Sequence, residues 1–543
     1  MEKKWYKEGF VYQIYPLSFC DSNNDGIGDL KGITSKLDYI KSLGVSVIWL
    51  SPVYKSPMYD NGYDISDYYD INPIFGDMDD FKELLSETHK RGLKLIMDLV
   101  VNHTSSEHEW FKKSIEGIEP YKDYYIWREK PNNWSSFFAG PAWDYSSERK
   151  MYYLHLFAKQ QPDLNWENEK VRDEVKNVLR FWLDMGVDGF RCDVINLLSK
   201  KEGLPNGRGL FLRGKEHFIN GPKIHEYLKE LKHEVLDNYD AFTVGESCFV
   251  TTKTAIPYIK EGEEELNMLF QFDHMGVDNL LKWFFHHKAK LSKLKKALRN
   301  WQEEINGVGW NTLYFENHDQ PRSVSRFGNL NYRYESATML AIMLFHEQGT
   351  PYIYQGQEIG MTNPNFDLLD DYKDVETHNI YKTGTKTLHF SHKKMMKKIK
   401  FMSRDNARTP MQWNDCLNAG FSDFNPWIKV NPNYKEINVS SDLKSDKSII
   451  RFYQKMINLR KEYPIIVYGD FKEYKKCSNK IVYYERNYKG DKLIVLCNYS
   501  SKERKIKAKL DNAELLLNNY EESTEIFKPY QAKVYIIKGE KNE

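Results

Sequence analysis

The stretch LKLIMDLVVNHT, Leu93–Thr104, joins an apolar run to a polar end and is typical of a buried β-strand that opens into a loop. Similar runs rich in Val, Ile and Leu recur along the first two thirds of the chain and alternate with longer stretches of helical period. The strands that we expect are Val11–Tyr15, Val45–Leu50, Leu93–Leu99, Gly189–Cys192, Phe242–Val244, Met268–Phe272, Asn311–Phe315 and Pro351–Tyr354. This repeat predicts an α/β chain with a (β/α)8 barrel, although periodicity alone also allows an open doubly wound sheet.

The chain outside this repeat predicts two further regions. The third and fourth expected strands are widely separated, and the residues between them are dense in aromatic residues, Pro and Asn and poor in helical period. We therefore expect a barrel over residues 1–103 and 171–465, with an inserted subdomain B over residues 104–170. Short alternating strands with turn residues between them predict a C-terminal antiparallel β domain over residues 466–543.

The composition excludes several classes of protein. Of the 543 residues, 41% are hydrophobic and 29% are charged, which is typical of a folded globular chain. The formal net charge is +1, so no general positive field attracts nucleic acid. Aromatic residues reach 15%, and flat rings are useful where sugar rings stack. A small neutral partner fits this balance better than a polyanion does.

Nothing in the sequence suggests a secreted or membrane protein. The N-terminus is charged, and the longest apolar run, Met339–Phe345, is too short to cross a bilayer. The six cysteines form no CxxC pair, so reduced thiols are expected. We expect a cytoplasmic monomer that binds neither nucleic acid nor a membrane.

Polar residues follow several of the expected strands. The C-terminal strand ends of a barrel meet at one mouth, so side chains there face a common pocket. They are Asp98 and His103 on the third unit, Arg191 and Asp193 on the fourth, Glu246 on the fifth, and His318 and Asp319 on the seventh. A single strand-end Asp is usually a helix cap. Several such ends together favour acetal chemistry at a sugar anomeric carbon, where one carboxylate attacks and a protonated carboxyl donates to the leaving oxygen.

Six motifs add detail to this interpretation. They are DLVVNHTS (Asp98–Ser105), GFRCDVIN (Gly189–Asn196), VGES (Val244–Ser247), ENHDQPR (Glu316–Arg322), QPDLNW (Gln161–Trp166) and GTPYIYQGQEIGM (Gly349–Met361). Together they resemble the α-amylase family, glycoside hydrolase family 13, over nearly the whole chain. The resemblance implies a retaining enzyme in which Asp193 is the nucleophile, Glu246 the general acid/base and Asp319 the carboxylate that supports the transition state. In retaining enzymes the two reacting carboxyls are roughly 5–5.5 Å apart.

Residues around this triad are expected to hold the sugar. Arg191 lies two residues before Asp193, on the same strand face, where its charge would favour the ionised nucleophile. The resemblance implies that His103 and His318 donate to sugar hydroxyls. Further matches to sugar-binding positions are Asp60 and Arg408, a pair that closes the far end of the pocket, Tyr63, which stacks on the nonreducing glucose, and Phe138, Phe157 and Gln161, which line it.

Two segments resemble one group within the family, the oligo-1,6-glucosidases and related exo-acting α-glucosidases. They are QPDLNW and MSRDNARTPMQWN (Met402–Asn414). Val194, after the nucleophile, matches members that prefer α-1,6 bonds, whereas α-1,4-specific maltases tend to have Ala. The resemblance implies release of terminal glucose from the nonreducing end of short α-glucosides, with α-1,6 bonds as in isomaltose and panose.

Other activities on the same scaffold stay open. Hydrolysis of trehalose-6-phosphate, action on sucrose or maltose, and transglucosylation belong to related enzymes, and the sequence does not decide whether the substrate is phosphorylated. The isomerase signature RLDRD is absent after Phe272, where the chain reads DHMGVD. A non-catalytic amylase-like protein is disfavoured because the carboxylate triad is complete.

An acidic loop after the first expected strand predicts a metal site. The segment DSNNDGIGD, Asp21–Asp29, spaces oxygen ligands at alternate positions, as a wrapped Ca²⁺ loop requires. Its twelfth position is Gly32 instead of Glu, which argues against an EF-hand. The resemblance implies one structural Ca²⁺, or Mg²⁺, held by Asp21, Asn23, Asp25, the Ile27 carbonyl and Asp29. The alternative is a polar turn whose side chains cap its own backbone.

Overall fold

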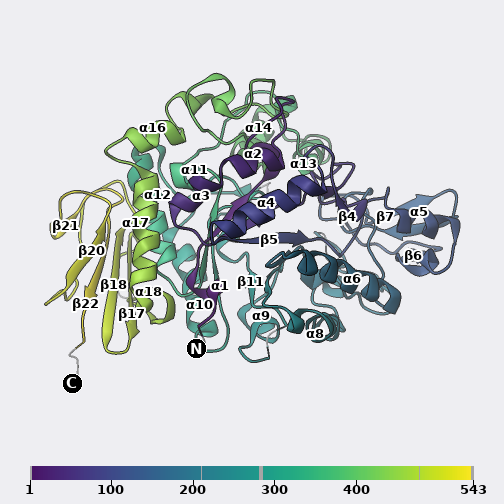
Figure 1. Cartoon of the computed structure of the whole chain (residues 1–543), viewed down its shortest axis with the longest axis horizontal. Coiled ribbons are helices and arrows are strands. Elements are labelled where there is room, and N and C mark those ends of the chain that lie inside the picture. The colour runs from purple at the N-terminus through teal and green to yellow at the C-terminus, as the bar shows by residue number, and fades with distance from the viewer. Residues whose placement is uncertain (1–2, 210, 264, 281–284, 476, 540–543) are drawn as a thin grey trace.

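The computed structural model describes residues 3–539 except 210, 264, 281–284 and 476. Its centre is a parallel sheet in the order β11-β10-β9-β5-β2-β1-β15-β14 (Figure 1). The strands are β1 (Val11–Ile14), β2 (Val47–Leu50), β5 (Lys94–Leu99), β9 (Gly189–Cys192), β10 (Phe242–Glu246), β11 (Met268–Phe270), β14 (Thr312–Leu313) and β15 (Thr350–Tyr354). All of the expected strands are present, several of them shorter at one or both ends.

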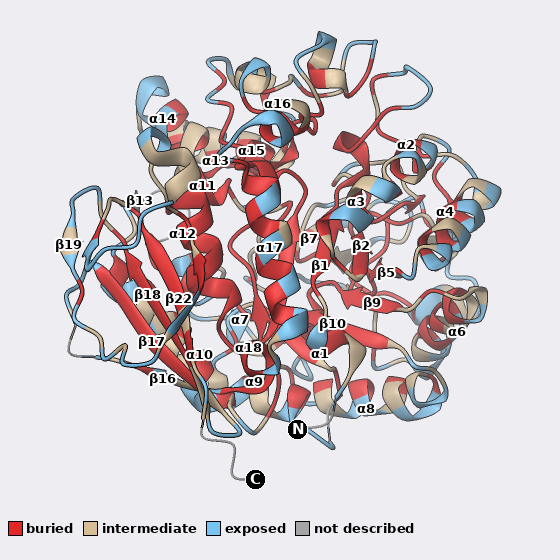
Figure 2. Cartoon of the chain, turned by 60° about the vertical axis from the view of Figure 1, so that its left-hand side comes forward, coloured by how far each residue is buried: buried red, intermediate tan, exposed pale blue. Residues whose placement is uncertain are grey.

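The two outer strands of this sheet meet. Leu269 of β11 pairs in parallel with Asn311, the residue before β14, so the sheet closes on itself. The closure confirms the predicted (β/α)8 barrel and excludes the open sheet. Parallel strands covered on both faces are buried throughout, and the barrel strands are accordingly coloured as buried in Figure 2.

Helices surround the barrel where the chain shows helical period. The longer ones are α4 (Met78–Lys90), α6 (Glu169–Met185), α8 (Ile224–Glu234), α9 (Thr252–Ile259), α10 (Leu291–Ile305), α12 (Arg333–Phe345) and α17 (Ile449–Glu462). In α6 the Asn168 side chain accepts from the Lys170 N–H, and the helix ends at Gly186, whose φ is 105°. The apolar stripe of α6 between these ends is buried against the barrel.

Leu30, Ile33, Leu37, Ile40 and Leu43 recur at steps of three and four residues, which predicts one helix from Leu30 to Leu43. The structure divides it into α2 (Leu30–Ser35) and α3 (Leu37–Leu43). Lys36 between them has φ −105° and ψ 4°, outside the helical range. The Thr34 and Ser35 hydroxyls in the last turn of α2 donate to carbonyls of the preceding turn. Such bonds weaken regular helix geometry, although the apolar period continues through the break.

The chain between β5 and β9 forms a small antiparallel sheet of its own. It consists of β6 (Trp127–Arg128), β7 (Trp143–Ser146) and β8 (Met151–Leu154) in the order β6-β8-β7, with α5 (Glu109–Glu116) beside it. An isolated bridge between His103 and Asp163 ties this insertion to the end of the third barrel unit. The insertion projects to one side of the barrel in Figure 1. The exact limits 104–170 stay a prediction.

The C-terminal part is an antiparallel sheet, as expected. Its order is β16-β17-β18-β22-β20, formed by Asp470–Glu473, Ile481–Tyr488, Asp491–Asn498, Ala532–Ile537 and Glu514–Asn518 respectively. The sheet lies beside α12 and α17 (Figure 1), and its inner residues belong to the same apolar cluster as the barrel. The limits of this domain, 466–543, also stay a prediction.

Among the residues that the structure describes, no helix is both long and apolar enough to cross a membrane. The expected cytoplasmic location and monomeric state stay predictions.

Candidate active site

Arg191 stands at the centre of the mouth between three carboxylates. Its Nη1 lies 2.7 Å from Asp193 Oδ1 and also donates to Asp98, while its Nη2 lies 2.5 Å from Glu246 Oε2. Asp98 belongs to β5, Asp193 follows β9, and Glu246 ends β10, so neighbouring barrel strands supply all four groups. We call Asp98, Arg191, Asp193 and Glu246 the Arg191 cluster.

Burial sets the protonation of the Arg191 cluster. Burial raises the pKa of Asp98 to about 6, although Arg191 opposes this shift. Burial also raises the pKa of Asp193 well above its usual range; Arg191 lowers it, while the Glu246 and Asp98 carboxylates raise it further. Arg191 therefore favours the ionised nucleophile, as the sequence predicts, but one cation cannot offset three buried carboxylates. The cluster therefore binds a proton more tightly than exposed carboxylates do.

The two histidines are buried and neutral. Burial lowers the pKa of His103 to about 4 and that of His318 to about 3. The Gln13 amide lies 2.8 Å from His318 Nδ1, which places the ring proton on Nε2, 2.8 Å from the Tyr63 hydroxyl. The rings of Tyr63 and His318 stack at 5.3 Å. Neutral imidazoles of this kind can donate to a sugar hydroxyl without adding charge.

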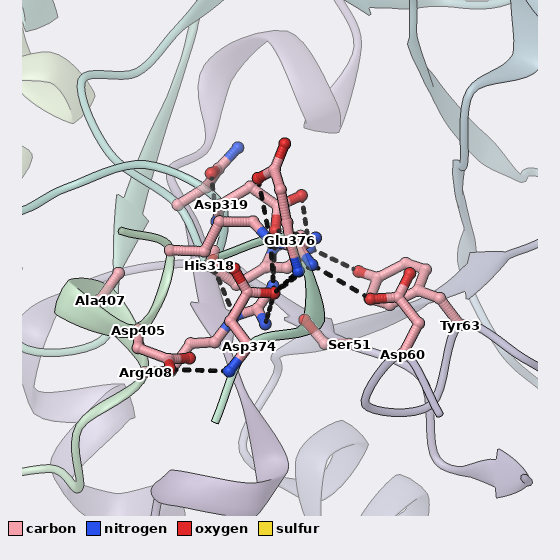
Figure 3. Close-up of polar contacts among 12 residues, drawn as sticks. Ser51, Asp60, Tyr63, His318, Asp319, Asp374, Glu376, Asp405, Ala407 and Arg408 are labelled. Carbon is pink, nitrogen blue, oxygen red and sulfur yellow. Dashed lines mark hydrogen bonds and ion pairs between the residues drawn. The ribbon is translucent and has the colours of Figure 1, made fainter. Parts of the chain in front are cut away.

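A second set of charged groups begins beside His318, whose Nε2 lies 3.4 Å from Asp319 Oδ2 (Figure 3). Asp319 Oδ1 lies 2.7 Å from Arg408 Nη2 and 3.3 Å from Arg404 Nη1. Burial opposes ionisation of Asp319, but His318 and the two arginines outweigh it and hold the pKa of Asp319 below its usual range. This carboxylate is therefore ionised at any physiological pH.

Asp60 and Arg408, expected as a pair at the far end of the pocket, are connected through Arg404 and Asp319. Asp60 Oδ1 lies 3.2 Å from Arg404 Nη2, and Arg408 Nη2 lies 2.7 Å from Asp319 Oδ1. Arg404 and Arg408 are one helical turn apart and face the same side. The closing role of Asp60 and Arg408 stays a prediction. Burial raises the pKa of Asp60, and the arginines oppose that shift.

A third carboxylate, Asp374, contacts both arginines; Figure 3 shows it near Arg408. Its Oδ1 lies 2.5 Å from Arg404 Nη2 and 3.7 Å from Arg408 Nη1. Asp374 is fully buried at the N-terminus of α13 (Val375–Lys386). We call Asp60, Asp319, Asp374, Arg404 and Arg408 the arginine-pair cluster.

The remaining expected sugar-binding residues come together between the two clusters. Gln161 Nε2 lies 3.2 Å from Asp60 Oδ2 and 3.1 Å from His103 Nε2. The Phe157 ring lies 5.1 Å from the His103 ring, and Phe138 lies 5.0 Å below the Arg404 guanidinium. The insertion thus covers the same pocket as the barrel loops.

Sequence reasoning missed Arg404 and Asp374. Arg404 lies within the quoted segment Met402–Asn414, so its position was available as a signal. Asp374 lies in the long excursion after β15, where no strand end or helical period marks it. Only the folded chain brings it to the arginines.

The acidic loop after β1 is closed by its own hydrogen bonds. Asp21 Oδ1 accepts from the Asn23 and Asn24 N–H groups, and Asp29 Oδ1 accepts from Gly32 N–H at 2.6 Å. Asp25 Oδ1 accepts from the Ile27 N–H at 2.8 Å. In the described ranges, no group of three or more His, Cys, Asp or Glu side chains is arranged to hold a metal ion. The loop still offers Asn23 and carbonyl oxygens, which suit a hard cation.

Comparison with known proteins decides the family. The model of the alpha-amylase catalytic domain matches residues 13–469. The chain belongs to the alpha-amylase family. Within this family it is 52% identical to an oligo-1,6-glucosidase of Parageobacillus thermoglucosidasius, over 99% of this chain and 100% of the relative. It is 45% identical to the trehalose-6-phosphate hydrolase of Bacillus subtilis, over 98% of each chain.

Solved structures of alpha-amylase family members share the fold throughout. A crystal structure of Bacillus licheniformis trehalose-6-phosphate hydrolase superposes with a TM-score of 0.94 at 45% identity, covering 99% of this chain and 100% of that one. The isomaltulose synthase of Klebsiella sp. LX3 gives a TM-score of 0.95 at 39% identity, with the same coverage. The fold is therefore common to family members that are named for different activities.

Proposed function

We propose that the chain is a retaining α-glucosidase that releases terminal glucose from the nonreducing end of short α-glucosides, with a preference for α-1,6 bonds. The observation that carries this proposal is the placement of the arginine-pair cluster. Arg404, from the excursion after β15, bonds to Asp60, from the loops after β2, and to Asp319, after β14. These bonds tie three loops together beside the Arg191 cluster, which suits a pocket that admits one chain end.

In the proposed reaction the Asp193 carboxylate attacks the anomeric carbon while Glu246 gives its proton to the glycosidic oxygen. The bond to the leaving sugar breaks, and a glucosyl ester with Asp193 forms. Glu246 then takes a proton from water, the water oxygen attacks the same carbon, and the ester bond breaks.

The other residues would hold the glucose ring. Asp319, ionised by its arginines, would accept from ring hydroxyls, and neutral His103 and His318 would donate to them. Asp60 and Arg408 would reach the far end of the ring, with Tyr63 stacked on it. Phe138, Phe157 and Gln161 of the insertion would complete the wall.

Two observations support the proposed preference for α-1,6 bonds: the position of Val194 and the names of the relatives. Val194 has a backbone φ of 34°, and its N–H lies 3.4 Å from Glu246 Oε2, so its side chain is near the leaving group. A methyl group at such a position discriminates by only about 1–3 kcal/mol. Four of the curated relatives, at 45–52% identity, are named oligo-1,6-glucosidase.

The test is product release from isomaltose, panose, maltose, sucrose, trehalose and trehalose-6-phosphate. We expect glucose from isomaltose and panose first, and a loss of about 10⁴-fold or more in kcat/KM with Asp193→Ala. Activity on none of the substrates would refute the hydrolase proposal. Full activity of Asp193→Ala would refute the assignment of Asp193 as the nucleophile and leave the hydrolase proposal in place.

The second candidate is a trehalose-6-phosphate hydrolase. It is favoured by the 45% identical relative and by the TM-score of 0.94 to a solved enzyme of that name. Cleavage of trehalose-6-phosphate in preference to isomaltose would select this candidate. The triad and the fold would be the same in both cases.

We further propose that the loop Asp21–Asp29 holds one structural Ca²⁺, or Mg²⁺, through Asp21, Asn23, Asp25, the Ile27 carbonyl and Asp29. All five donors are oxygens, as these cations prefer. A melting temperature that rises with Ca²⁺ in the wild type and not in Asp25→Ala would support the site. An equal response of both proteins would contradict it.

A further inference from the structure

We propose that Asp374 is a positioning residue that fixes Arg404 and Arg408 and thereby sets the affinity of the pocket for the nonreducing glucose ring. The proposal rests on the proposed function, because it assumes that Asp60 and Asp319 bind that ring. Asp374 itself touches neither the ring nor the reacting atoms. It acts through the arginines that hold the two ring-binding carboxylates.

Both oxygens of Asp374 cap α13, and Oδ1, which accepts from the Glu376 N–H at 3.3 Å, also contacts Arg404. Oδ2 accepts from the Thr377 N–H at 3.1 Å and from the Thr377 hydroxyl at 2.9 Å, which caps α13. Oδ1 accepts from Arg404 through Nε at 3.1 Å and Nη2 at 2.5 Å. The backbone N–H of Asp374 donates to Asp405 Oδ2 at 2.9 Å. The carboxylate is therefore fixed in place independently of the arginines.

An ordinary helix cap does not need a guanidinium partner. Burial opposes ionisation of Asp374, but Arg404 and Arg408 outweigh it and lower the pKa of this carboxyl. The contact with arginine is thus an ionic one at a carboxylate with no exposed surface. Removing one member of such a buried set leaves the other charges uncompensated.

Arg404 connects Asp374 to the sugar-binding carboxylates. Its Nη2 contacts both Asp374 and Asp60, and its Nη1 contacts Asp319. Arg408 Nη1 has no hydrogen-bond partner within the described part of the chain, although it lies 3.7 Å from Asp374 Oδ1. The two like charges repel each other, and both are faced by Asp319 on the sugar side and by Asp374, which does not touch the sugar.

The effect of Asp374 should not depend on the leaving group. Its contacts run to Asp60 and Asp319, whereas Asp193 and Glu246 are held by Arg191. An interaction that acts on the glucose ring in the bound substrate and in the transition state alike changes KM and leaves kcat in place. The same factor should therefore appear for substrates that share only the terminal glucose.

The experiment compares Asp374→Asn with the wild type. Asn keeps the shape and can still cap a helix, but it removes the charge. We expect the Kd of glucose, measured by calorimetry, to rise about ten-fold or more. We expect KM to rise by the same factor for isomaltose, panose and p-nitrophenyl α-glucoside, with kcat changed by less than about three-fold.

Two control variants separate positioning from folding. Asp442→Asn changes another buried capping carboxylate, which accepts from the Ile449 and Ile450 N–H groups at the start of α17, and should leave the glucose Kd unchanged. Thr377→Val removes a hydroxyl from the helix side of Asp374 and should lower the melting temperature without weakening glucose binding. If Asp374→Asn does not fold, Arg404→Lys, which keeps the charge but loses the fork, should show the same rise in glucose Kd.

An unchanged glucose Kd in folded Asp374→Asn would overturn the proposal, and so would an unchanged Kd in Arg404→Lys. Equal weakening by Thr377→Val would also overturn it, because Asp374 would then act only as a helix cap. A factor that differs among the three substrates would place the effect at the leaving group instead. Failure of the wild type to bind glucose would contradict the proposed function, which is a distinguishable result.

Discussion

The Arg191 cluster and the arginine-pair cluster are built from the same groups but differ in protonation. In the first, one arginine serves three carboxylates, and the pKa values of Asp98 and Asp193 are raised. In the second, two arginines serve Asp60, Asp319, Asp374 and Glu376, and the pKa values of Asp319 and Asp374 are lowered. Asp98, Asp193 and Asp374 are all buried, so burial alone does not explain the difference.

The ratio of cations to each single carboxylate explains it: Asp98 and Asp193 contact one arginine, whereas Asp319 and Asp374 contact two. A buried carboxylate without its own cation lowers its free energy by keeping a proton, whereas one shared between two guanidinium groups is more stable ionised. Asp60 fits this rule, since its one ion pair among the described residues is with Arg404 and its pKa is raised. We infer that the Arg191 cluster stores the proton needed for acid catalysis and that the arginine-pair cluster presents fixed negative charge to sugar hydroxyls.

The largest expected effect that separates the clusters is that of Glu246→Gln. Loss of a general acid should lower kcat/KM for isomaltose by about 10²–10⁴-fold. The loss should be smaller for p-nitrophenyl α-glucoside, because nitrophenolate leaves without a proton. Steady-state kinetics on both substrates measures the difference.

Asp319→Asn is the control for this comparison. It changes the glucose side of the pocket, so its loss should be similar on the two substrates. A Glu246→Gln loss that is equal on both substrates would break the assignment of the proton to the Arg191 cluster.

The next effect concerns the pH dependence of Arg191→Gln. Arg191 lowers the pKa of Asp193, so its removal should raise that pKa further. Because the attacking carboxylate must be ionised, the acidic limb of the kcat/KM profile should move to higher pH. A shift of one to two units lowers kcat/KM on that limb by about ten- to a hundred-fold. The profile of kcat/KM against pH measures it.

Arg408→Gln is the matched control, because it removes an arginine from the other cluster. Its acidic limb should stay in place while KM rises. If both variants move the limb equally, the two clusters do not control separate protons, and the comparison fails.

The smallest effect is expected for Asp60→Asn. Burial already favours the neutral form of Asp60, and its ionic partner is Arg404 at 3.2 Å. KM should therefore rise by about ten-fold or less, which corresponds to one weakened charge-assisted hydrogen bond. Measurement of KM beside Asp319→Asn ranks the two, and a larger effect at Asp60 would contradict the ratio argument.

Most of the fold follows from local sequence patterns. Strands of a parallel barrel are covered on both faces and read as continuous apolar runs, which is why all of the barrel strands could be predicted. Periodicity alone left barrel closure open, because the pairing of Leu269 with Asn311 leaves no periodic signal. The break at Lys36 was missed for a related reason, since the apolar period runs on through it.

The residues of the candidate site also fall into a group that the sequence could predict and a group that it could not. Residues at strand ends, such as Asp193, Glu246 and Asp319, were predictable because the barrel brings those ends to one mouth. Arg404 and Asp374 come from the excursion after β15, and their positions depend on tertiary packing. Arg404, which pairs with Asp60, could not be singled out from the sequence, because two arginines one turn apart present equivalent side chains to a sequence pattern.

The most direct test of the central claim is infrared difference spectroscopy of the carboxyl C=O stretch at pH 7. If the Arg191 cluster holds the proton, the wild type shows a protonated-carboxyl band that disappears in Glu246→Gln and persists in Asp319→Asn. Its absence from the wild type, or its loss in Asp319→Asn with retention in Glu246→Gln, would contradict the claim that the Arg191 cluster holds the proton.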